Sequence, residues 1–229
     1  MIEVTKISKA FGGKAVLQDL EFSANNSETI GIVAPNGSGK SVILETIIGR
    51  IIPDKGLVKI SKGAFSHIYY MPQKDNYPDN MLVSEVIDFY LEANKKKVSS
   101  EQRQYYIKRY GLEKLVSNKV TALSGGQQRK LGIVLTMLLK PRIAVLDEPS
   151  AGIDLKSTLL FREDVKSLTS TLVLLTSHTT EDLLSTADRL IFLQGGRVIY
   201  ELERKDFSQF SKLYADLFTN VSTEDSKYA

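Results

Sequence analysis

Three apolar runs that lack polar alternation constrain the fold of this chain more than any other feature. The runs are Thr29–Val33, Ile143–Leu146 and Thr171–Leu175. Such runs are typical of strands that are covered on both faces, as in the parallel sheet of an α/β protein. A Gly-rich loop follows the first run, Asp147 and Glu148 follow the second, and Ser177 and His178 follow the third. We therefore expect the chemistry at the carboxyl edge of one sheet, where open α/β sheets bind ligands.

The segments around these runs predict antiparallel strands and a group of helices. Apolar residues on both sides of Gly12–Gly13 predict an amino-terminal hairpin, and short strands are expected at 57–60 and 67–70. Between about residues 75 and 140 the apolar period becomes helical, which indicates an inserted helical subdomain. Within it, Ser99 is a candidate N-cap and Gly111 a candidate helix stop.

The carboxyl-terminal part predicts a hairpin around Gly195–Gly196 and then an amphipathic helix. The apolar positions of this helix are Phe207, Phe210, Leu213, Tyr214, Leu217 and Phe218. Packing against the core is the expected use of this stripe, and a dimer or partner contact is the alternative. The polar tail from Asn220 onward is expected to be loose.

The composition argues against several classes of function. Lys and Arg number 30 against 27 Asp and Glu, so the net charge of +3 creates no strongly basic field for nucleic acid. The chain has no cysteine, which removes disulfides and thiolate chemistry. The start lacks the pattern of a signal peptide, and the apolar run Leu131–Leu139 is far shorter than the roughly 20 residues of a membrane span. We expect any membrane role to come through a partner.

The loop at 34–41, Ala-Pro-Asn-Gly-Ser-Gly-Lys-Ser, has the features of a phosphate cradle. A loop that runs from a strand into a helix aims backbone N–H groups at one phosphate, and the helix dipole favours negative charge there. Lys40 would neutralise the β- and γ-phosphates, and Ser41 would hold Mg²⁺. An ordinary Gly-rich turn is the alternative, and Ala34 stands where the usual pattern has glycine. The residues expected to bind nucleotide are Asn36, Gly37, Ser38, Gly39, Lys40, Ser41 and Val42.

Asp147 and Glu148 supply a metal ligand and a general base at adjacent positions. Asp147 would bind Mg²⁺ directly or through water, and Glu148 would polarise the attacking water. Adjacent carboxylates that only end a strand are also common. Their expected place at the carboxyl edge of the sheet favours the functional interpretation.

The segment 123–127, Leu-Ser-Gly-Gly-Gln, is the most specific signal in the chain. Ser124 has the position of an N-cap, and the helix that follows continues to Lys140–Pro141. A serine hydroxyl, two glycines and a helix start describe a second phosphate site, and a capped turn without a ligand is the alternative. The helix starts after the loop 34–41 and at the segment 123–127 can both serve one nucleotide only if they approach it from opposite sides.

These segments together resemble the ATP-binding subunits of ABC transporters over about residues 1–201. The Leu-Ser-Gly-Gly-Gln segment matches the signature of that family in full. The family pairs two subunits head to tail, so the resemblance implies that Ser124, Gly126 and Gln127 of one subunit face the ATP held by Lys40 of the other. It also implies ATP and Mg²⁺ as cofactors.

The resemblance assigns roles to further residues. Gln73 is similar to the Q-loop glutamine, which contacts Mg²⁺ or water. His178 is similar to the switch histidine, which hydrogen-bonds the γ-phosphate and would support Glu148. Phe11 resembles the aromatic residue that stacks on adenine, and Asp154 resembles the D-loop aspartate at the dimer seam. Each of these residues also has an alternative interpretation when it is taken alone. Gln73 would then be an ordinary surface residue, His178 a structural residue and Phe11 a core residue at a strand end. The implied catalytic residues are Lys40, Gln73, Glu148 and His178, and the implied metal ligands are Ser41, Gln73 and Asp147.

The same resemblance implies the fold class. It is an α/β fold, a P-loop NTPase core with a mainly parallel sheet, an antiparallel β subdomain and an inserted helical subdomain. The chain, 1–229, would form a single ABC-type ATPase domain. Its parts would be the core with the antiparallel subdomain at about 1–74 and 141–201, the helical subdomain with the signature at about 75–140, and the C-terminal helix and tail at about 202–229.

The implied function is an ATPase that powers transport through a separate membrane permease subunit. It would act as a homodimer or heterodimer of ATPase subunits, in the cytoplasm and peripherally on the inner face of the cell membrane. The short connection after Gln73 favours export slightly over import. Leu155, where many members have proline, is expected to change little.

Two alternatives stay open. One is an ABC-type ATPase that acts with soluble partners in repair or translation, although the sequence lacks the long coiled-coil insertions and tandem units of those relatives. The other is a regulatory nucleotide-binding module with little turnover, which Ala34 motivates because alanine does not reach positive φ as easily as glycine.

Overall fold

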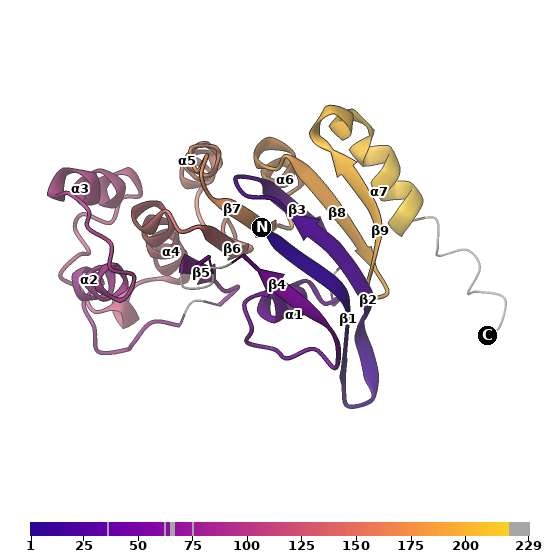
Figure 1. Ribbon diagram of the computed structural model, residues 1–229. Helices are drawn as coiled ribbons and strands as arrows, with labels where there is room; N and C mark the ends of the chain where they lie inside the picture. The colour runs from indigo at the N-terminus through magenta and orange to yellow at the C-terminus, as the bar shows by residue number, and fades with distance from the viewer. Residues whose placement is uncertain (36, 62, 65–66, 75, 220–229) are drawn as a thin grey trace.

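A six-stranded sheet in the order β5-β6-β7-β3-β8-β9 runs through the centre of the molecule in the computed structural model (Figure 1). Neighbouring strands from β5 to β8 are parallel, and β9 pairs with β8 in the antiparallel sense. The strands are β3 Thr29–Val33, β5 Ile68–Met71, β6 Ile143–Asp147, β7 Leu172–Thr176, β8 Arg189–Gln194 and β9 Arg197–Glu203. The structure describes residues 1–35, 37–61, 63–64, 67–74 and 76–219.

The three apolar runs form β3, β6 and β7, and every residue of these strands is buried. The prediction of strands covered on both faces is therefore confirmed. The three strands are neighbours in the sheet and parallel, so the loops after them leave from the same edge. Asp147, directly before Glu148, pairs in register with Thr176, which lies two residues before His178.

A second, antiparallel sheet has the strand order β2-β1-β4. The predicted amino-terminal hairpin is confirmed, since the two strands on either side of Gly12–Gly13 pair with each other. The expected strand near 57–60 pairs with the other edge of the first strand. The bounds are β1 Ile2–Phe11, β2 Lys14–Ala24 and β4 Lys55–Ile60.

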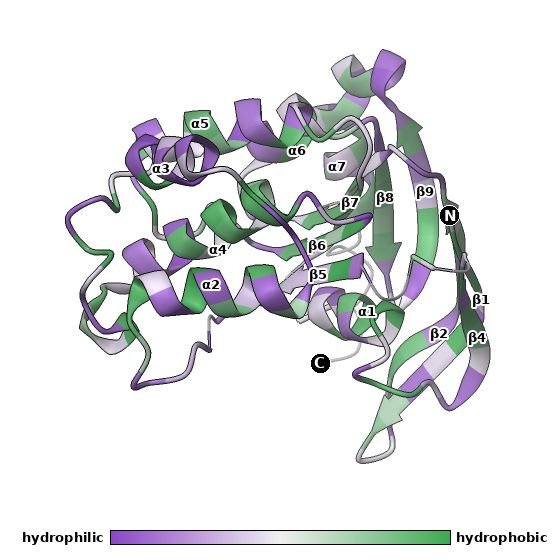
Figure 2. Ribbon diagram, turned by 60° about the vertical axis from the view of Figure 1, so that its left-hand side comes forward, coloured by the Kyte–Doolittle hydropathy of each residue, from purple (hydrophilic) through white to green (hydrophobic). Residues whose placement is uncertain are grey.

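Two apolar layers cover the faces of the central sheet. On one face, Ile43, Leu44 and Ile47 of α1 pack together with apolar residues of β1 and β2. On the opposite face, α4, α5 and α6 contribute apolar residues to the other core. Figure 2 shows β6, β7 and β8 in green, with α4, α5 and α6 along one side of them. The helices are α1 Lys40–Ile47, α4 Gly125–Leu139, α5 Leu155–Lys166 and α6 Thr180–Thr186.

The helical segment between β5 and β6 lies to one side of the sheet, where Figure 1 shows α2, α3 and α4 at the left. The predicted cap of α3 is confirmed, because Ser99 Oγ accepts a hydrogen bond from Gln102 N at 3.2 Å. Gly111, with φ of 68°, follows the end of this helix as predicted. Among the described residues, none of the helices combines the length and apolar character that a membrane crossing requires. The bounds are α2 Val83–Ala93, α3 Ser100–Arg109 and the 3₁₀ turn η2 Val120–Ala122.

The carboxyl-terminal stripe packs against the core, as expected. After a 3₁₀ turn, η3 Arg204–Gln209, the helix α7 Phe210–Phe218 lies alongside β8 and β9 (Figure 1). The ring of Phe192 on β8 lies 5.8 Å from that of Phe210 and 6.2 Å from that of Phe218. The predicted loose tail, 220–229, lies outside the described residues.

The aromatic packing of α7 predicts a measurable share of the stability. Phe210 is 5% exposed, so Phe210→Ala should lower the free energy of unfolding by about 3 kcal/mol through lost apolar burial and the cavity left behind. Chemical denaturation would measure this loss. Tyr214→Ala on the same helix, where the side chain is 39% exposed, should cost clearly less and serves as the control. Equal, small losses in both variants would contradict the packing of α7 on the core.

Candidate functional site

A surface cleft of about 530 Å³ gathers half of the predicted site residues. It lies where the loops after β3, β5, β6 and β7 leave the central sheet, next to the start of α1. This confirms the expected convergence at one carboxyl edge. The lining residues are Val16, Gly37, Gly39, Lys40, Ser41, Val42, Gln73, Glu148 and His178.

The loop after β3 turns back on itself before it enters α1. Ser38 Oγ donates to the carbonyl of Pro35 at 2.6 Å. Gly39 has φ of 92°, and a Cβ there would lie 2.8 Å from Cγ1 of Val16, so the loop requires glycine at this position. Ala34 does not have a positive φ, so the loop does not need glycine there. The predicted site residue Asn36 lies outside the described residues.

Lys40 is the cation of the cleft. Its ammonium donates to the carbonyls of Ala34 and Pro35, at 2.8 Å and 3.1 Å. Burial lowers the pKa of Lys40 from its ordinary value, while the nearby carboxylates of Glu148 and Asp147 act in the opposite direction. The site therefore places a partly desolvated cation between a backbone loop and two carboxylates, where its attraction for a phosphate is stronger than in water.

Asp147 carries the observation that bears on a metal ion. Its carboxylate is 1% exposed, and Oδ1 accepts a hydrogen bond from Thr176 Oγ1 at 2.6 Å. Oδ2 is buried and has no hydrogen-bond partner among the described residues. A buried carboxylate oxygen without a partner is costly unless a cation or water satisfies it, so Asp147 fits Mg²⁺ ligation. The described residues contain no cluster of three or more acidic, His or Cys side chains for a metal.

Glu148 and His178 are in direct contact. Oε1 of Glu148 lies 2.6 Å from Nε2 of His178 across the end of the β6–β7 pair. Glu148 has φ of 53°, an uncommon conformation for a residue with a side chain, and its N–H donates to Thr176 Oγ1 at 3.0 Å. The carboxylate is 8% exposed, whereas the imidazole is 51% exposed. The pair thus places a buried carboxylate beside an accessible imidazole.

Gln73 is exposed in the cleft and follows Pro72. Sequence reasoning missed the residue that holds this segment in place, Arg129 on α4, which is 3% exposed. Its guanidinium donates to the backbone carbonyls of Pro72, Asp147 and Glu148. The sequence offered one signal for this role. Arg129 lies one helical turn after Gly125 and close to the apolar run Leu131–Leu139, where a charged residue needs a buried partner.

The signature segment forms the capped helix start that was predicted. Ser124 Oγ accepts from Gln127 N at 3.3 Å, and Gln127 Oε1 accepts from Ser124 N at 2.9 Å. These residues do not line the cleft that contains Lys40. A Cβ on Gly126 would lie 2.6 Å from the carbonyl oxygen of Gly152, so this glycine lets α4 approach the loop before α5.

Asp154 caps α5 and contacts α4, the helix that begins at the signature segment. Its Oδ1 accepts from Ser157 N at 2.9 Å, and its Oδ2 lies 2.5 Å from Lys130 Nζ. The hydrogen bond from Lys130, followed by those from Ser157, lowers the pKa of Asp154 below its usual range. The residues similar to the signature and the D-loop therefore form one surface in this chain.

Phe11 lies at the end of β1 with 47% of its surface exposed. The ammonium of Lys9 lies 5.5 Å from the centre of its ring. Phe11 does not line the cleft, whereas Val16 of the same hairpin does. Contact between Phe11 and a nucleotide stays a prediction.

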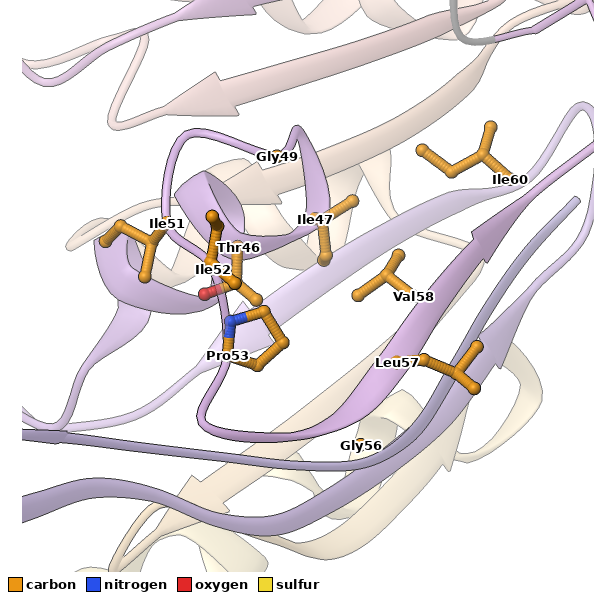
Figure 3. Close-up of a pocket in the computed structure, with 10 residues that line it drawn as sticks. All are labelled: Thr46, Ile47, Gly49, Ile51, Ile52, Pro53, Gly56, Leu57, Val58 and Ile60. Atoms are coloured by element: carbon orange, nitrogen blue, oxygen red, sulfur yellow. The ribbon is translucent and has the colours of Figure 1, made fainter.

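A separate pocket of about 580 Å³ lies between the end of α1 and β4 (Figure 3). Ile47, Ile51 and Ile52 come from the end of α1 and the segment after it, and Leu57 and Val58 from β4. Because the lining is mainly apolar, this pocket lacks the charged groups that phosphate binding requires.

Comparisons with known proteins point to one family. The ABC transporter family profile matches residues 17–151. The Nod factor export ATP-binding protein I of Rhizobium etli is 33% identical, and the match covers 87% of this chain and 67% of that protein. The zinc import ATP-binding protein ZnuC of Psychrobacter cryohalolentis is 29% identical, over 84% of this chain and 79% of that protein.

The fold also agrees with a solved structure. The dimeric post-hydrolysis structure of the ATP-binding cassette MJ0796, bound to ADP and Pi, superposes with a TM-score of 0.77 at 23% identity. The superposition covers 89% of this chain and 99% of that chain.

The contacts of Arg129 predict a large stability effect. Arg129→Leu leaves the carbonyl of Pro72 and the buried carbonyls of Asp147 and Glu148 without this donor, so the free energy of unfolding should fall by about 3 kcal/mol. Denaturant titration would measure the change. The neighbouring Lys130→Leu, which removes one ion pair to a half-exposed carboxylate, should cost less than about 1 kcal/mol. Similar costs for the two variants would show that Arg129 does not hold these segments.

Proposed function

This chain belongs to the ABC transporter family, and from this premise we propose that it hydrolyses ATP to power transport through a separate membrane permease subunit. The observation that carries the proposal is the contact between Glu148 and His178 at 2.6 Å, in the same cleft as Lys40. In this proposal Glu148 would be the base, His178 would contact the γ-phosphate and Lys40 would neutralise its charge.

The proposed mechanism relies on positioning and charge. The N–H groups of the loop before α1 and the positive end of that helix would receive the phosphates, and Lys40 would exchange its contacts with Ala34 and Pro35 for phosphate oxygens. Glu148 would accept a proton from the attacking water, and His178 would hydrogen-bond the γ-phosphate. No side chain needs to form a covalent bond with the phosphate, because catalysis of phosphoryl transfer rests mainly on positioning and electrostatic stabilisation.

Mg²⁺ would be held by the hydroxyl of Ser41, by Oδ2 of Asp147 and by Gln73, which lines the same cleft as Ser41. When bound, it would neutralise charge on the phosphate oxygens. The buried, unpartnered Oδ2 of Asp147 supports this assignment. Thr176 holds Oδ1 at 2.6 Å and so leaves Oδ2 for the ion.

The complete site would form between two subunits. Ser124, Gly126 and Gln127 do not line the cleft with Lys40, although a helix start of this kind suits a phosphate. A head-to-tail pair would bring these residues of one copy to the nucleotide held by the other, with Asp154 at the seam. The dimeric state of the similar cassette MJ0796 supports this proposal.

We assign the whole of 1–229 to one ABC-type ATPase domain, with the helical segment at about 75–140 as its subdomain.

The subunit would lie in the cytoplasm, where its permease would hold it at the inner face of the membrane. Export is the proposed direction because the connection between Gln73 and α2 is short. Similar proteins include both export and import subunits, so a transport assay should follow both directions.

Glu148→Gln tests the proposed base. The amide cannot accept the proton, so kcat for ATP should fall by at least about 100-fold while ATP binding persists. With Mg²⁺ and ATP the variant should also accumulate as a dimer in size-exclusion chromatography, because closure would outlast the blocked hydrolysis. Glu203→Gln, an exposed position on β9, is the matched control. Turnover near that of the wild type in Glu148→Gln would reject the assigned base.

Ala34→Gly tests whether the phosphate loop limits turnover. Because Ala34 does not use a positive φ, the added freedom of glycine should leave kcat within about twofold of the wild type. Steady-state ATP hydrolysis would measure this. A large rise in kcat would instead favour the regulatory module with little turnover.

A further inference from the structure

A buried carboxylate behind the cleft connects the two loops that carry Glu148 and His178. Asp182 lies in α6, and its side chain is 0% exposed. Oδ1 accepts from Arg162 Nε at 2.6 Å, and Oδ2 accepts from the hydroxyls of Ser177 and Ser150, the former at 3.0 Å. A fully buried charge is tolerated only when such donors satisfy it.

The two hydroxyls belong to the segments that hold the reacting side chains. Ser150 follows Glu148 by two residues, and Ser177 directly precedes His178. Ser177 Oγ also accepts from Thr179 N at 3.0 Å, so the turn around His178 is held on both sides of that residue. The imidazole of His178 is 51% exposed and cannot be held by packing alone.

A carboxylate suits this place for a chemical reason. Both oxygens of Asp182 accept hydrogen bonds, and every partner is a donor. An asparagine of the same shape would offer one acceptor oxygen. Its NH₂ group would either face the guanidinium of Arg162, which cannot accept, or face the serine hydroxyls, which would have to reverse and accept from it. Asp182→Asn should therefore either release the guanidinium of Arg162 or replace the charged acceptor of the two serine hydroxyls by a weaker, neutral contact.

We infer that Asp182 is a positioning residue that sets the distance between Glu148 and His178. It does so by tying the loop after β6 to the loop after β7 through Ser150 and Ser177. This inference rests on the proposed ATPase activity, because it concerns the same pair of side chains.

Kinetics give the first test. Asp182→Asn should lower kcat about 10- to 100-fold, the loss expected when reacting groups are misplaced by about 1 Å, and should leave the KM for ATP within about twofold. Asp164→Asn is the matched control, because Asp164 is also buried and accepts from Tyr110 Oη at 2.7 Å and Arg109 Nε at 3.1 Å, away from the cleft. It should lower the thermal stability but keep kcat.

Ser177→Ala is the milder variant if Asp182→Asn does not fold. It removes one hydroxyl from Asp182 and should lower kcat in the same direction by a smaller factor. In a His178→Ala background, Asp182→Asn should add little further loss, because both changes would act on the same step. Fully additive losses, or a kcat that falls equally in Asp164→Asn, would overturn the inference.

The imidazole signals give a readout that does not depend on turnover. The chain contains 2 histidines, His67 and His178, so ¹⁵N-histidine NMR gives one probe at the site and one internal reference. Asp182→Asn should shift the signals of His178 and leave those of His67 in place, whereas Asp164→Asn should move neither. Unchanged His178 signals would overturn the inference even if kcat falls. A folded wild type that binds but does not hydrolyse ATP would instead reject the proposed function, and the NMR result would still decide the role of Asp182.

Discussion

The parallel pairing of β6 with β7 is the contact on which the candidate site depends. It places Asp147 opposite Thr176, whose hydroxyl donates to Asp147 Oδ1 at 2.6 Å and accepts from Glu148 N at 3.0 Å. A slip of one residue would turn the side chains of the strand to the other face. Both faces are buried, so a slip would have to repack two apolar layers and break the bond between Thr176 and Asp147, and with this the register holds the two carboxylates in place.

Buried charges then fix the loops beyond the strand ends. Arg129 joins the signature helix to the carbonyls of Pro72, Asp147 and Glu148, and Asp182 joins the loops after β6 and β7. Apolar contacts are not directional, whereas a guanidinium or a carboxylate in a buried place requires partners at defined angles. The core thus supplies the frame, and these polar contacts supply the geometry in which Glu148 meets His178.

The sequence predicted the strands and helix starts better than the polar contacts between distant residues. The runs without alternation identified β3, β6 and β7, and the capping pattern at Ser124 identified the start of α4, because these features are local. The pairing of Glu148 with His178 was implied by the family resemblance and is confirmed by their contact. The reach of Arg129 to Pro72 and the burial of Asp182 depend on residues far apart in the chain. No local period contains that information, so these contacts became visible only in the folded structure.

The proposal that two copies share each nucleotide can be tested most directly by cross-linking. The chain has no cysteine, so Ser38→Cys in the phosphate loop and Ser124→Cys in the signature segment each introduce a single thiol. Both would be made in the Glu148→Gln background, mixed with Mg²⁺ and ATP, and oxidised gently. A head-to-tail pair predicts a disulfide-linked dimer in the mixture and little in either variant alone. A mixture that binds ATP but forms no linked dimer would contradict the shared site.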